Sequence, residues 1–194
     1  TSQNAIDIEV SNTDDLDDLV EAIVKANQNL EKSNQSNNWE QIGNIIHRES
    51  QLDFIGQGVS RGLFAPTIRY HNGRFYCICT QVDRIGNFFV YADNPEGPWS
   101  DPIVIPGAEG IDPSLFFDDD GKVWYTGTRP APEGVKWNGN WEIWIQQLDI
   151  QTGKLLGEPK GIWRGALKQC IWPEGPHIYK IDGTYFLMHA EGGT

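Results

Sequence analysis

The chain has few cysteines and no long apolar segment, and both absences limit its class. Three of its 194 residues are cysteine, too few for the disulfide framework of a small secreted domain. Cys77 and Cys79 alternate on a strand pattern and are too close in sequence to bridge, which favours buried free thiols. No segment approaches the roughly 18 apolar residues of a membrane helix, and no signal peptide is visible after Thr1. The sequence therefore indicates no membrane helix, while secreted, periplasmic and cytoplasmic locations all stay open.

Positive charge is also scarce. The chain has 15 Lys and Arg residues against 27 Asp and Glu residues, which gives a formal net charge of −12. The phosphate backbone of a nucleic acid and an anionic membrane surface would both be repelled, so neither is an expected partner. Neutral carbohydrate stays open as a ligand, because sugars are bound by aromatic faces and hydrogen bonds rather than by net charge. A second interpretation is that the charge only keeps the protein soluble.

Turn residues and aromatic side chains are abundant. There are 21 Gly and 11 Pro, together with 8 Trp, 8 Phe and 6 Tyr. Many Gly and Pro residues favour short strands joined by turns over long helices, and the aromatic side chains supply large apolar surfaces for a core. For this length we expect one domain, or one domain with a small appendage.

The first 38 residues differ from the rest. Asp7–Val10 is a candidate short strand, and residues 13–32 place their apolar side chains on one helical face. Four aspartates in the first turn of this helix suit the positive end of the helix dipole, and we do not interpret them as a metal site. A polar linker follows at 33–38. We predict an N-terminal strand and helix over 1–38 and a main domain over 39–194.

From Trp39 onward the pattern is all-β and it repeats. Three segments run from a proline through an alternating strand to a tight-turn pair and then into an aromatic strand. The turn pairs are Asn72-Gly73, Asp120-Gly121 and Asp182-Gly183. Further strands follow the first two segments, which predicts four-stranded units at about 65–106 and 111–164, one outer strand near Gln41–His47 before them and an opening hairpin after them. Such units are typical of β-propeller blades; a sandwich of short strands is the alternative.

Several motifs of the main domain occur together and in order. They are Asn38–Gly43, Ser50–Asp53, Ala65-Pro66, Tyr70–Gly73, Gly110–Ser114, Glu174–His177 and Ala190–Thr194. In these motifs the chain resembles glycoside hydrolase family 43, the five-bladed propellers that include β-xylosidases and α-L-arabinofuranosidases. The resemblance covers about four fifths of the chain and implies a partial five-bladed propeller, incomplete at both ends.

The resemblance also implies roles for individual residues. Glu174 matches the general acid that protonates the departing glycosidic oxygen, and its pKa must be raised for this task. Asp112 matches the aspartate that adjusts this pKa and orients the acid; alone, it could equally be a turn carboxylate before proline. Trp172 is a candidate sugar platform or a core tryptophan. Phe64 stands where the family usually has Trp, and His177 is expected to line the active site.

The family's general base is not found in this chain, because no Asp-Pro strand precedes Trp39. Two functions therefore stay open. One is an inverting glycosidase acting on xylan- or arabinan-derived glycans, and the other is a non-catalytic sugar-binding or structural remnant. A structural calcium ion is compatible with the resemblance, but its ligands cannot be assigned, and we expect no other metal or cofactor. Open strand edges of an incomplete propeller predict self-association.

Overall fold

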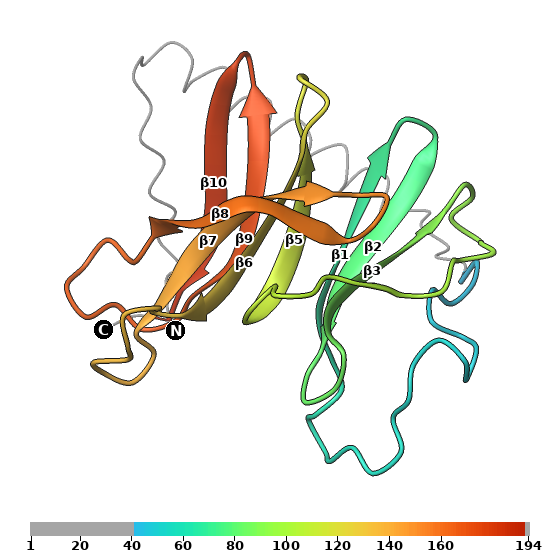
Figure 1. Cartoon of the computed structure of the whole chain (residues 1–194), viewed down its shortest axis with the longest axis horizontal. Helices are drawn as coiled ribbons and strands as arrows, with labels where there is room; N and C mark the ends of the chain where they lie inside the picture. Colours follow the sequence, from blue (N-terminus) through green and yellow to red (C-terminus); the bar gives the residue numbers. More distant parts are fainter. Residues whose placement is uncertain (1–40, 193–194) are drawn as a thin grey trace, which may run out of the picture. The chain divides into compact units, whose positions relative to one another are not determined.

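The computed structural model of the chain describes residues 41–192. All regular secondary structure in this part consists of β-strands (Figure 1). The prediction of an all-β main domain is confirmed for these residues. The strand and helix predicted within 1–38 lie outside the described residues, so they and the boundary between 38 and 39 stay predictions.

The first sheet is antiparallel and has the order β1-β2-β3-β4. Its strands are β1 (Leu63–His71), β2 (Arg74–Gln81), β3 (Gly86–Ala92) and β4 (Ile103–Val104). Alternate residues of β2 are buried on opposite faces: Tyr76 and Ile78 belong to one apolar cluster, Cys77 and Cys79 to another. The sheet is therefore covered on both sides, and the thiols are free and buried.

A second antiparallel sheet repeats the same order, as β5-β6-β7-β8. Its strands are β5 (Ile111–Phe117), β6 (Val123–Pro130), β7 (Trp141–Asp149) and β8 (Lys154–Trp163), and a separate hairpin of β9 (Pro173–Ile181) and β10 (Thr184–Glu191) follows. The two predicted four-stranded units and the hairpin after them are confirmed. Within the described part of the chain β10 pairs only with β9; self-association through such an edge stays a prediction.

Two of the three tight turns form as predicted. Both residues of Asn72-Gly73 and of Asp182-Gly183 have positive φ, as a two-residue hairpin turn requires. At Asp120-Gly121 only the glycine does, and the connection between β5 and β6 is longer, closed by a hydrogen bond of 3.0 Å from the Gly121 amide to the Asp118 carbonyl. A type I turn followed by a left-handed glycine explains this difference.

The predicted strand near Gln41–His47 is wrong, because this segment is irregular and the first strand begins at Leu63. The backbone amides of His47 and Arg48 bond to a side chain and not to a partner strand. Gln51 Oε1 accepts their hydrogen bonds at 2.9 and 3.0 Å. Leu52 then anchors the segment in the apolar cluster on the outer face of the first sheet.

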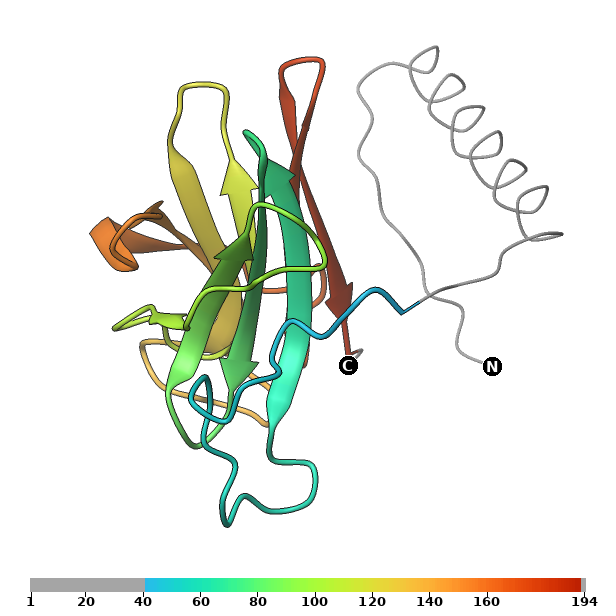
Figure 2. The ribbon, with the colours of Figure 1, turned by 90° about the vertical axis from the view of Figure 1, so that its right-hand side faces the viewer.

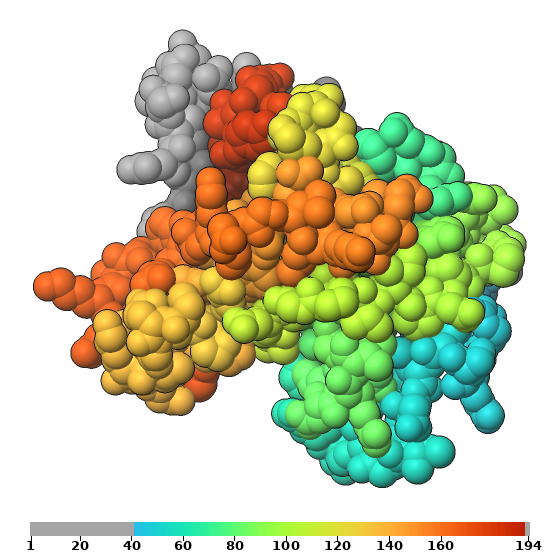
Figure 3. Space-filling view, viewed as in Figure 1, coloured from blue at the N-terminus to red at the C-terminus, as the bar shows by residue number. Residues whose placement is uncertain are grey.

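The main core lies between the two sheets. It is made of buried residues from both sheets and of Ile105, which directly follows β4. The sheet residues are Tyr76, Ile78, Phe89, Leu115, Val123, Tyr125, Trp144 and Leu148. The turn before β8 lies close to β4, at the edge of the first sheet (Figures 2 and 3). A Cβ on Gly153 in this turn would lie 2.6 Å from the Val104 carbonyl oxygen. We call β1, β5 and β9 the first strands, because each begins one of the two sheets or the hairpin. They are neighbours in this packing, with β5 in contact with both β1 and β9.

Candidate active site

Each of the three neighbouring first strands is irregular at the same point. The register shifts in β1 after Phe64, in β5 after Ile111 and in β9 after Glu174, so these three residues hold equivalent positions. The next residue in each strand has positive φ and precedes a proline: 44° at Ala65, 54° at Asp112 and 61° at Gly175. A proline cannot donate to a ladder and is found at bulges of this kind. The bulges therefore come from the sequence and redirect the side chains beside them.

The bulges bring Asp112 and Glu174 to the same place. Asp112 Oδ2 accepts a hydrogen bond of 3.1 Å from the amide of Gly175, the residue that follows Glu174. Both residues lie within the first strands of their units, Asp112 in β5 and Glu174 in β9. The left-handed conformation of Asp112 is costly for a residue other than glycine, and such strain is often retained at functional sites.

The surroundings of the two carboxyl groups raise the pKa of both. Burial raises the pKa of Asp112, and the hydrogen bond from Gly175 opposes this shift. Partial desolvation raises the pKa of Glu174, and the negative charge of Asp112 raises it further. The charge of an ionised Asp112 thus favours the protonated form of Glu174, which is the form that acid catalysis needs.

His177 lies beside this pair and contacts a residue from the first sheet. Arg69 Nη2 lies 2.9 Å from His177 Nδ1. Because a guanidinium only donates, Nδ1 accepts and the ring proton of neutral His177 is on Nε2. Burial, and then the positive charge of Arg69, lower the pKa of His177. The imidazole is thus held neutral with one donor free for a ligand.

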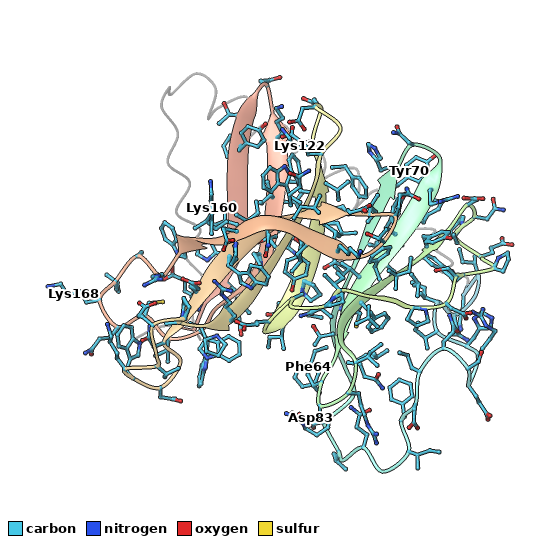
Figure 4. The ribbon with its side chains drawn as sticks, viewed as in Figure 1. Phe64, Tyr70, Asp83, Lys122, Lys160 and Lys168 are labelled. Atoms are coloured by element: carbon cyan, nitrogen blue, oxygen red, sulfur yellow. The ribbon has the colours of Figure 1, made fainter. Side chains whose placement is uncertain are left out.

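Asp112, Arg69 and His177 help to line a hollow of about 290 Å³ between β1, β5 and β9, whereas Glu174 lies beside it, next to the lining residue Gly175. Its lining residues are Ala65, Pro66, Thr67, Ile68, Arg69, Asp112, Gly175 and His177. Phe64 lies at the start of β1, at the end of the strand away from Tyr70 and away from the β5–β6 turn that carries Lys122 (Figure 4). The bulges therefore form one end of the strand layer, and the hairpin turns form the other.

The two aromatic candidates lie beside the hollow and do not line it. Phe64 is half-buried next to Ala65, and its carbonyl accepts a bond of 3.2 Å from the Cys79 thiol. Trp172 is 40% exposed, and its indole packs on Gly139, where a Cβ would lie 3.1 Å from the ring. Trp172 is thus partly exposed, two residues before Glu174 in the chain.

Arg69 is the site residue that sequence reasoning missed. The register of the three first strands makes Thr67, Ser114 and His177 equivalent. Arg69, two residues after Thr67, lies on the same face by strand alternation. Aligning the three repeats on their prolines could therefore have placed Arg69 on the face that His177 uses.

No metal site accompanies these residues in the described part of the chain, where no three His, Cys, Asp or Glu side chains are grouped closely enough to hold an ion. The calcium ion compatible with the resemblance stays unassigned. Residues 41–192 also contain no helix that could cross a membrane.

Comparisons with known proteins agree on one family. The sequence model of "Glycosyl hydrolases family 43" matches residues 24–194. A "Xylosidase/arabinosidase" of Butyrivibrio fibrisolvens is 62% identical over 158 residues, which cover 80% of this chain and 30% of that protein. "Xylosidase/arabinosidase 43B" of Humicola insolens is 40% identical, with 81% and 30% covered.

Solved structures give the same result. The chain is similar to "a GH43_12 retrieved from capybara gut metagenome", with a TM-score of 0.73, 44% identity, and 80% of this chain and 30% of that one covered. It is also similar to a xylan beta-1,4-xylosidase from Bacillus halodurans, with a TM-score of 0.67, 40% identity and the same coverage. The chain thus spans about 30% of the length of these relatives.

Proposed function

The chain belongs to glycosyl hydrolase family 43, and we propose that it carries the acid side of a glycosidase active site for xylan- or arabinan-derived glycans. One observation carries this proposal. The Asp112 carboxylate is bonded to the amide next to Glu174, and its charge helps to keep Glu174 protonated. We further propose that the two four-stranded sheets and the β9–β10 hairpin are blades of a propeller with the site where their first strands meet.

In this proposal Glu174 donates its proton to the glycosidic oxygen as the bond to the anomeric carbon breaks. Asp112 stays ionised and orients the segment that carries the acid. His177 offers its Nε2 proton to a sugar hydroxyl, since Arg69 occupies Nδ1. Trp172 and Phe64 supply aromatic surface beside the scissile bond. An inverting reaction also needs a base carboxylate about 6.5–9.5 Å from the acid, with the attacking water between them.

Aryl β-xylosides and aryl α-L-arabinofuranosides test the proposal when leaving groups of different acidity are compared. Glu174→Gln should lower the rate of hydrolysis by about 10²–10⁴-fold for poor leaving groups, because these need protonation. The loss should be much smaller for activated leaving groups. Glu158→Gln is the control, because Glu158 is an exposed carboxylate on β8. Equal losses with all leaving groups would contradict an acid role for Glu174.

The same samples separate the alternative function. If xylo- or arabino-oligosaccharides bind to the unmodified protein and no substrate is turned over, the non-catalytic remnant replaces the glycosidase proposal. Isothermal titration calorimetry with these oligosaccharides gives that result directly.

A further inference from the structure

Two buried hydroxyl groups hold the segment that carries Glu174. Thr128 Oγ1, on β6, donates to the Pro173 carbonyl at 2.6 Å, and Ser114 Oγ, on β5, donates to the Pro176 carbonyl at 2.7 Å. These carbonyls flank Glu174 and Gly175 on both sides. We propose that Thr128 and Ser114 are positioning residues that fix the Glu174 carboxyl group relative to Asp112.

The bonds cross between units that share no strand ladder. β9 pairs with β10, whereas β5 and β6 belong to the second sheet. The hydroxyl bonds and the bond from the Gly175 amide to Asp112 therefore join residues 173–176 to that sheet at three successive points. Three attachments over four residues leave the acid little freedom to move.

Burial makes the two hydroxyl bonds hard to replace. Thr128 has no exposed surface and Ser114 is 1% exposed, so water cannot easily bond to either carbonyl if a hydroxyl group is removed. Thr128 Oγ1 also lies 3.4 Å from the Glu142 carbonyl, but its single proton belongs to the much shorter contact with Pro173. Loss of the bond should shift the segment, because a buried carbonyl without a partner is unfavourable.

A small shift matters because both causes of the raised Glu174 pKa depend on its position. Movement toward solvent weakens the desolvation of the carboxyl group and its interaction with the Asp112 charge. A displacement of about 1 Å can also cost on the order of 10²-fold in rate when a reacting group must be aligned. The rate effect rests on the proposed function, whereas the effect on the Glu174 pKa does not.

Thr128→Val removes the hydroxyl group with little change of shape, and Thr128→Ser retains it. Thr126→Val is the matched control: Thr126 is equally buried on the same strand, and its hydroxyl bonds at 2.8 Å to Trp144 within the second sheet. The pKa of Glu174 is read by NMR from ¹³C-labelled glutamate carboxyl groups, with Glu174→Gln to assign the signal. Hydrolysis of poor and activated aryl glycosides is measured on the same samples.

We expect Thr128→Val to bring the Glu174 pKa closer to its ordinary value and to slow hydrolysis with poor leaving groups by about 10–100-fold. Thr128→Ser should restore both, and Thr126→Val should leave both unchanged. If Thr128→Val does not fold, Ser114→Ala takes its place, with the same expected change. The inference is overturned if the Glu174 pKa in folded Thr128→Val, or in Ser114→Ala when that variant replaces it, equals the Glu174 pKa in the control Thr126→Val. A protein without hydrolytic activity but with the expected pKa changes would refute the proposed function and leave the positioning role standing.

Discussion

Replacement of the buried Glu142 by glutamine should strongly destabilise the second sheet. Glu142 has no exposed surface, and each of its carboxylate oxygens bonds to a different arginine. Oε1 accepts from Arg129 Nε and Nη2 at 3.0 and 2.9 Å, and Oε2 accepts from Arg164 Nε and Nη2 at 3.0 and 2.7 Å. One carboxylate thus joins β6, β7 and the segment that follows β8.

The magnitude follows from the burial of the partners. Removing one member of a buried ion pair costs about 3–5 kcal/mol, because the remaining charge loses its compensation. The Arg129 side chain is only 9% exposed, and its other carboxylate contact, Glu109, is 3.6 Å away and 68% exposed. The Arg164 side chain is 51% exposed and can be hydrated. We therefore expect the lower end of the range, about 3 kcal/mol, for Glu142→Gln.

Urea denaturation followed by tryptophan fluorescence measures this loss. The slope with urea should stay constant while the midpoint falls, because the folded structure is retained and only its stability changes. Glu133→Gln is the control: Glu133 also pairs with Arg164, but its side chain is 42% exposed, and exposed pairs contribute about 0–1 kcal/mol. A loss below about 1 kcal/mol for Glu142→Gln would refute the reasoning, since the Arg129 charge would then be well accommodated without Glu142.

Two further predictions concern the His177 imidazole in the candidate site and the Tyr125 hydroxyl in the main core. Arg69→Met should raise the pKa of His177 in an NMR titration, but the pKa should stay below its ordinary value because burial still lowers it. In the unmodified protein the lowered pKa of His177 contributes stability above about pH 6.5, and this contribution is lost as the pH falls from there through the lowered pKa. A His177 pKa that did not rise would contradict the assigned contact. Tyr125→Phe should leave stability equal or increase it by up to about 1 kcal/mol, because the Tyr125 hydroxyl is buried without a hydrogen-bond partner among the described residues. A clear decrease in the urea midpoint would show that this hydroxyl is bonded in solution.

The strands and their repetition could be predicted from the sequence, because both are local properties. Alternation of apolar side chains defines a strand whatever it packs against, and the two-residue turns at Asn72-Gly73 and Asp182-Gly183 require positive φ that those residues adopt easily. In the sequence, the prolines after Ala65, Asp112 and Gly175 marked only the starts of repeating units, and the bulges beside them were not predicted. The ordered motifs from Asn38 to Thr194, including those around Asp112 and Glu174, predicted the family, whereas the catalytic roles of these two residues stay proposals.

The sequence did not predict which distant side chains meet, because these contacts depend on how the sheets pack. Arg69 and His177 are 108 residues apart and share a hydrogen bond because β1 and β9 both lie against β5. Thr128 reaches the Pro173 carbonyl beside Glu174 because β6 also lies against β9. The strand expected near Gln41–His47 does not form. Ile45 and Ile46 pack against the apolar cluster on the outer face of the first sheet, and the nearby Gln51 side chain bonds the His47 and Arg48 amides. Contacts of this kind depend on how sheets pack, which no local pattern of residues encodes.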